Sequence, residues 1–141
     1  MGSDQRVGDA FGDFGTVIIE SGSVTATGGK AETANAGGGA GIGSGGETTK
    51  AENGITLIGS IQINGGTVVA TGGDGEDWSL TGGGAGLGSG GATGGFYTAD
   101  SDIQIKITAG QVTATGTADG AGIGGGANVN GGVIEISGGN V

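Results

Sequence analysis

The chain has 141 residues, which is enough for one domain, and 41 of them are glycine. The absence of proline and of a Gly-X-Y triplet excludes collagen, and the absence of cysteine and histidine excludes disulfides, thiolate chemistry and histidine-dependent catalysis. Fourteen acidic residues stand against four basic ones, and the net charge of −10 excludes the basic surface that nucleic acids and anionic membranes require.

The first fourteen residues precede the repeated part of the chain. Met1-Gly2-Ser3 is typical of a cloning start, and Phe11 and Phe14 are large apolar residues ahead of the first expected strand. Because a repeat protein needs a cap on each exposed end, we expect residues 1–14 to be a tag and an N-terminal cap. Residues 15–141 are then the repeat domain.

One nine-residue pattern occurs three times after this segment, at residues 21–29, 65–73 and 109–117. Its central valines are evenly spaced, since 68 − 24 = 44 and 112 − 68 = 44. A fixed period of this size indicates a repeat architecture, in which each unit buries its apolar face only against its neighbours.

Each repeat contains three short segments in which apolar residues alternate with polar residues or glycine, as in half-buried strands. The first carries two β-branched residues around a variable one, the second is Val-Thr-Ala-Thr or a close variant, and the third is Gly-Ala-Gly-Ile or Gly-Ala-Gly-Leu followed by glycine. These segments are 17–19, 61–63, 105–107 and 134–136; 24–27, 68–71 and 112–115; and 39–44, 84–89 and 120–125.

Three strands per repeat, joined at glycine-rich corners, predict an all-β fold. We expect a right-handed parallel β-helix, a solenoid of about three to four coils whose equivalent residues stack about 4.8 Å apart. The second and third segments are farther apart in the first two repeats (42 − 24 = 18 and 87 − 68 = 19) than in the third (123 − 112 = 11), which predicts loop insertions. The expected core columns are Val24, Val68, Val112 and Val141, and Ile42, Leu87 and Ile123.

The last repeat stops at Val141, which aligns with Val112. Nothing comparable to Phe11 and Phe14 follows it. We therefore expect the chain to be a fragment of a longer array, or its C-terminal end to be covered by a partner or by neighbouring repeats.

The motif V-T-A-T-G-G at residues 24–29, combined with G-A-G-I-G-S-G-G at residues 39–46, resembles Gly-rich repeats in large surface proteins of Gram-positive bacteria, especially clostridial relatives. The resemblance covers residues 15–141. It implies β-helices in adhesin-like, carbohydrate-associated proteins and an extracellular location on the bacterial cell surface. The matching residues are core and corner positions, so the resemblance assigns no ligand residue.

Two acidic clusters are candidate ligands for a hard cation. Asp74, Glu76 and Asp77 lie in one expected loop, and Asp100 and Asp102 lie in another. Calcium takes six to eight oxygen ligands, which two such loops and backbone carbonyls could supply. Neither cluster matches an EF-hand loop or the aspartate-rich nonapeptide of calcium-binding β-rolls, so the alternative is a set of solvated loop charges. Calcium is the one cofactor that the sequence suggests.

Three aromatic residues, Trp78, Phe96 and Tyr97, lie in the same two loops. Sugar rings stack on exposed aromatic faces, so these residues are candidates for binding a polysaccharide or host glycan. The alternative is that the rings fold the loops onto the strands as a small apolar cluster.

Outward-facing threonines are the third candidate surface. We expect one exposed column of Thr25, Val69 and Thr113 and a second of Thr27, Thr71 and Thr115. A flat ladder of this kind is compatible with ice binding, but threonine is also simply a good strand residue.

We expect a non-catalytic protein module with a structural or adhesive function. We expect no membrane insertion and no nucleic-acid partner. A calcium-dependent polysaccharide-binding module is the alternative, and a polysaccharide lyase or hydrolase is a further one. No carboxylate pair recurs at a spacing that would place two acids across a glycosidic bond, and Lys106 is the candidate base for a lyase. The expectation is therefore that the chain is not an enzyme.

Overall fold

The computed structural model describes residues 11–32, 36–46, 56–76, 82–92 and 100–141, and in these ranges the fold is all-β. No helix that could cross a membrane occurs in the described ranges. The ten strands are β1 (Phe11–Ile19), β2 (Ser23–Thr27), β3 (Ile42–Gly43), β4 (Thr56–Ile63), β5 (Thr67–Thr71), β6 (Leu87–Gly88), β7 (Asp100–Ile107), β8 (Gln111–Thr115), β9 (Ile123–Gly124) and β10 (Val133–Ile136).

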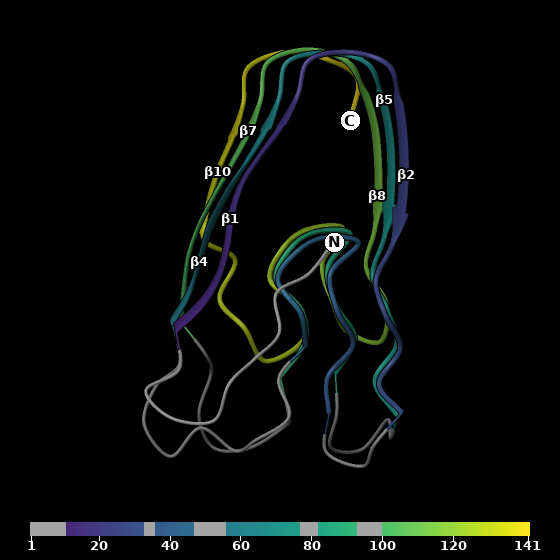
Figure 1. Ribbon diagram of the computed structural model, residues 1–141, viewed down its shortest axis with the longest axis vertical. Helices are drawn as coiled ribbons and strands as arrows, with labels where there is room; N and C mark the ends of the chain where they lie inside the picture. The colour runs from purple at the N-terminus through teal and green to yellow at the C-terminus, as the bar shows by residue number, and fades with distance from the viewer. Residues whose placement is uncertain (1–10, 33–35, 47–55, 77–81, 93–99) are drawn as a thin grey trace.

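The strands form three parallel sheets, and each of the first three repeats contributes one strand to each sheet. Sheet A has the order β1-β4-β7-β10, sheet B the order β2-β5-β8, and sheet C the order β3-β6-β9. The long strands of sheets A and B form the two sides of an arch in Figure 1, and the turns that join them lie at its top. In sheet B, segments 44 residues apart in the sequence therefore lie side by side.

Register follows the sequence repeat. In sheet B, Val24 pairs with Val68 and Val68 with Val112. In sheet C, Ile42 pairs with Leu87 and Leu87 with Ile123. These pairs confirm the predicted columns. The predicted alignment of Val141 is supported by its neighbour Asn140, which bridges to Gln111 of β8, but Val141 is 54% exposed and is not part of the core as predicted, because no further repeat covers it in the structure.

Aliphatic side chains from all three sheets form the core. The largest completely buried side chains come from the middle two strands of sheet A and from the centres of sheets B and C: Leu57, Ile61, Ile63, Leu87, Ile103, Ile105, Ile107 and Val68. Burying a side chain of this size stabilises the fold by about 1.5–3 kcal/mol. Residues between them, such as Gln104 and Lys106, are exposed. Alternation along each strand thus separates the core from the outer face.

The first strand begins earlier than the sequence pattern predicts. Residues 11–14 belong to β1 and pair with β4 in sheet A, whereas we expected them to precede the first strand. The register shifts between Asp13 and Thr16, so that Phe14 and Gly15 together oppose Gly59. This bulge interrupts the period-two alternation, which hides the strand in the sequence.

Phe14 packs against the core through a space that Gly59 leaves open. A Cβ atom at Gly59 would collide with the ring of Phe14, which is half-buried beside the core cluster. The aromatic ring and the glycine opposite it are therefore one packing unit within sheet A.

The C-terminal end of the structure is partly covered. Val129 follows β9 and is buried in the core cluster. On β10, however, Ile134 and Ile136 occupy core-type positions and remain 43% and 50% exposed. Apolar surface is thus left open at the last strand of sheet A.

Sheet C depends on a column of glycines, Gly43, Gly88 and Gly124. Their φ angles are +141°, +133° and +125°, in the region that residues with a Cβ rarely adopt. A Cβ on Gly43 would collide with the carbonyl oxygen of Gly88, and a Cβ on Gly88 with that of Gly124. At Gly43 and Gly88 backbone lies directly on backbone, so both the angle and the spacing require glycine, whereas at Gly124 the angle alone does.

We expect Gly88→Ala to lower the free energy of unfolding by at least about 1 kcal/mol, because alanine is strained at this φ and its methyl group has no space. Gly29→Ala is the matched control, since no atom lies within 4 Å of a Cβ there. Urea unfolding of both variants measures the difference. Equal stability of the two would contradict the stacking argument.

Candidate functional site

The acidic residues predicted to bind calcium lie at different places in the fold. Asp74 and Glu76 follow β5 of sheet B, whereas Asp100 and Asp102 are exposed on β7 of sheet A. Asp77 lies outside the described residues. In the ranges that the structure describes, no three acidic residues come close enough to hold a metal ion. The calcium site therefore stays a prediction from the sequence.

Asp100 has a different partner. Its Oδ1 atom accepts a hydrogen bond of 2.9 Å from Nδ2 of Asn130, which lies just before β10. Sequence reasoning missed this contact, because the two residues are 30 positions apart and belong to different repeats.

The aromatic residues predicted to bind sugar, Trp78, Phe96 and Tyr97, also lie outside the described residues. The polysaccharide site that they would form stays a prediction from the sequence.

The outer face of sheet B carries the two predicted threonine columns. Thr25 pairs with Val69 and Val69 with Thr113, and all three side chains are exposed. The second column, Thr27, Thr71 and Thr115, is in register beside it. Ser23, Thr67 and Gln111 form a third column, which was not predicted. The face is uncharged and offers hydroxyl and methyl groups at regular intervals.

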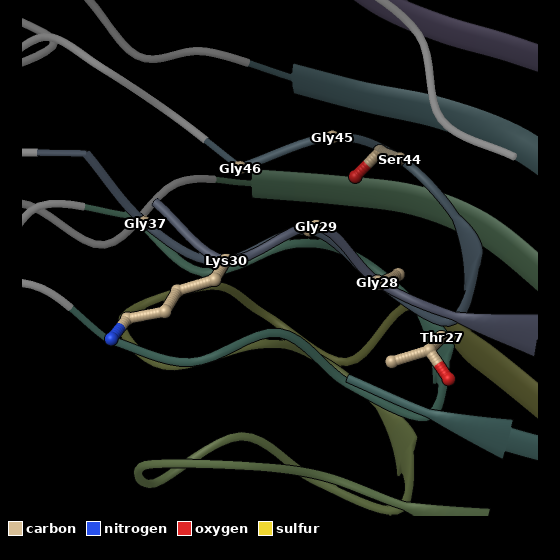
Figure 2. A pocket seen from close by; sticks show the side chains of 10 residues that line it. Thr27, Gly28, Gly29, Lys30, Gly37, Ser44, Gly45 and Gly46 are labelled. Carbon is tan, nitrogen blue, oxygen red and sulfur yellow. The ribbon is translucent and has the colours of Figure 1, made fainter. Parts of the chain in front are cut away.

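A pocket of about 250 Å³ opens at the first repeat, and sequence reasoning did not predict it. It is lined by Thr27, Lys30, Ala40 and Ser44 and by six glycines, Gly28, Gly29, Gly37, Gly39, Gly45 and Gly46. Figure 2 shows the Lys30 side chain extending away from Ser44. Among the described residues, no carboxylate lines this pocket, so these residues provide no acid or base pair for glycosidic chemistry.

The second repeat explains what the pocket is. There the N–H groups of Gly73 and Gly91 donate to the carbonyl oxygens of Gly39 and Gly38, both at 2.8 Å. Each of these bonds runs back to the first repeat. The equivalent donors of the first repeat are Gly29 and Gly46, which line the pocket. The pocket of the first repeat therefore corresponds to the surface at which, in the second repeat, one repeat stacks on another.

Buried serine hydroxyls join successive repeats in the same region. Ser44 and Ser89 are 0% exposed. Oγ of Ser44 accepts a hydrogen bond of 3.0 Å from N–H of Gly90, and Oγ of Ser89 accepts one of 2.8 Å from N–H of Gly126. The serine of one repeat therefore satisfies a backbone donor of the next.

Lys106, the candidate base of a lyase, lies on the outer face of sheet A. Its Nζ atom is 3.2 Å from Oε1 of Glu135 on the neighbouring strand, and both side chains are about half exposed. Lys106 does not line the pocket of the first repeat. The ion pair joins β7 to β10, and exposed pairs of this kind contribute little to stability.

We expect Ser89→Ala to lower the free energy of unfolding by about 1–3 kcal/mol, because the buried N–H of Gly126 loses its acceptor. Ser23→Ala, on the exposed face of sheet B, is the control and should change stability far less. Thermal unfolding followed by circular dichroism compares the two. If Ser23→Ala lowered the stability as much as Ser89→Ala, the hydrogen bonds of the buried serines between repeats would have no special role.

Comparisons with known proteins add no relative. No family model, no curated protein and no solved structure matches the chain. What the chain does must therefore be argued from its own repeats.

Proposed function

We propose that the chain is a non-catalytic structural and adhesive module of a bacterial cell-surface protein. Its architecture would be a right-handed parallel β-helix, a rigid solenoid that displays loops. The observation that carries this proposal is the parallel pairing of successive repeats, in matching register, in all three sheets. The right hand follows from the general preference of parallel strand crossovers.

Stiffness is the property that such a stack would supply. Backbone hydrogen bonds join each repeat to the next in every sheet, and the buried serines add side-chain bonds between repeats. Close glycine contacts allow backbone to lie on backbone, so neighbouring repeats have little freedom to slide. Load applied along the stack would be shared by many parallel bonds.

The chemistry of the described surface supports a binding or structural role over catalysis. The chain has no histidine or cysteine, and the acidic residues of the described ranges are distributed without forming a cluster of three. The uncharged outer face of sheet B is suited to contact with polar, uncharged material such as polysaccharide. The extracellular setting is supported by the resemblance of the repeat motifs.

Insertion of additional repeats tests whether the chain forms a rigid stack of repeats. Residues 24–67 comprise one repeat, since 67 − 23 = 44, and three extra copies placed after Thr67 preserve the register of every sheet. We expect the molecule to lengthen by about 14 Å, three times the spacing between strands, at constant cross-section. Small-angle X-ray scattering measures both quantities.

Two results would contradict this design. A growth several times larger would mean that the inserted copies fold as separate units, and loss of cooperative unfolding would mean that they do not stack. The control is an insertion of residues 24–45, half a repeat, which places apolar residues out of register. We expect this control to unfold.

An activity assay tests the non-catalytic assignment. We expect incubation with pectin and with mucin glycans to release no new reducing ends and no unsaturated sugars. Chromatography of the products, with a known lyase and a known hydrolase as positive controls, provides the measurement. Sustained release that follows the purified chain through a final size-exclusion step would make the protein an enzyme.

A further inference from the structure

Three Asn-Gly dipeptides occur in the sequence, at residues 53–54, 64–65 and 130–131. In such a dipeptide the backbone nitrogen of glycine can attack the side-chain amide of asparagine, because no Cβ obstructs its approach. The first dipeptide lies outside the described residues, and the other two have contrasting surroundings. We propose that Asn130 is a site of spontaneous deamidation and that the fold protects Asn64.

Asn64 is held on both sides of its amide. Nδ2 donates to Oε1 of Glu20 at 3.1 Å, while Oδ1 accepts from Oγ1 of Thr108 at 2.9 Å and from Nε2 of Gln62 at 3.2 Å. A Cβ at Gly65 would collide with the carbonyl oxygen of Glu20, so this part of the backbone lies tightly against the preceding repeat. Neither the amide nor the glycine nitrogen can move without breaking contacts between repeats.

Asn130 has far more freedom. Its side chain is exposed and, among the described residues, makes one hydrogen bond, from Nδ2 to Oδ1 of Asp100. Gly131 is also exposed, and the nearest atom to a Cβ built there is the nitrogen of Gly125 at 3.7 Å. The carbonyl carbon of the amide and the attacking nitrogen both have room to approach each other.

The reaction needs only water. The backbone nitrogen of Gly131 loses its proton to solvent and bonds to Cγ of Asn130, and the bond from Cγ to the side-chain nitrogen breaks, releasing ammonia. Water then adds to either carbonyl carbon of the cyclic imide and opens the ring. The product is aspartate or isoaspartate at residue 130, and no oxidation or reduction takes place.

Either product weakens the attachment of β10. The hydrogen-bond donor that faced Asp100 becomes a carboxylate, and two like charges then oppose each other. Isoaspartate also adds a carbon to the main chain just before β10. This strand is exposed along its length and, in the part of the chain that the structure describes, pairs with β7 alone. Deamidation therefore acts on the least protected strand of sheet A.

Site-resolved peptide mass spectrometry of the full chain, aged at mildly alkaline pH, tests the proposal. We expect deamidation at Asn130 to be at least roughly tenfold faster than at Asn64, a barrier difference of about 1.4 kcal/mol. Gly131→Ala is the diagnostic variant, because the added methyl group fits the structure but obstructs the attack. It should slow the reaction at Asn130 roughly tenfold and leave Asn64 and the unfolding temperature unchanged. Equal rates at the two sites, or an unaltered rate in Gly131→Ala, would overturn the assignment.

Hydrogen exchange tests the consequence for β10. Asn130→Asp reproduces one product, and Asn130→Ala removes the hydrogen bond without adding a charge. We expect the amide of Ser137, which donates to the carbonyl oxygen of Ile107, and that of Glu135 on the same side of β10 to exchange faster in Asn130→Asp than in Asn130→Ala, and faster in both than in the parent chain. Exchange in Asn130→Asp no faster than in Asn130→Ala would disprove the role of charge repulsion.

Discussion

Contact of backbone with backbone between successive repeats is the constraint on which the rest of the structure depends. Gly43 and Gly88 leave no room for a Cβ atom, and Ser44 and Ser89 beside them place hydroxyl groups where the next repeat has a backbone donor. The aliphatic columns can align only because these positions fix the distance between repeats. Glycine here is thus a requirement of packing, as much as of conformation.

Much of the fold could be predicted from the sequence. The spacing of Val24, Val68 and Val112 defined the register, and alternation within each segment separated the core from the outer face. The beginning of β1 could not be predicted in this way, because Phe14 and Gly15 break the alternation at a bulge whose partner, Gly59, lies 45 residues from Phe14 (59 − 14 = 45). Val129 escaped notice for a similar reason, since its turn belongs to no repeated segment.

The functional site could be predicted from the sequence less well than the fold. The sequence suggests that Asp74 and Asp100 both lie in inserted loops, but the structure places Asp74 after β5 of sheet B and Asp100 on β7 of sheet A. The contacts that do join distant residues, such as Asn130 with Asp100 and Thr108 with Asn64, depend on which repeat lies next to which. Such pairs become visible only once the register is known, because no local motif marks them.

The fit of Phe14 to Gly59 bears on how a repetitive chain selects one arrangement among several. A strand made of nearly identical units could pair with the wrong neighbour, one whole unit away. If β1 instead lay on β7, the ring would meet Ile103, which occupies in the third repeat the position of Gly59. A single aromatic side chain thereby distinguishes the correct partner from its near-copy, and protects folding against an error that periodic sequences are prone to make.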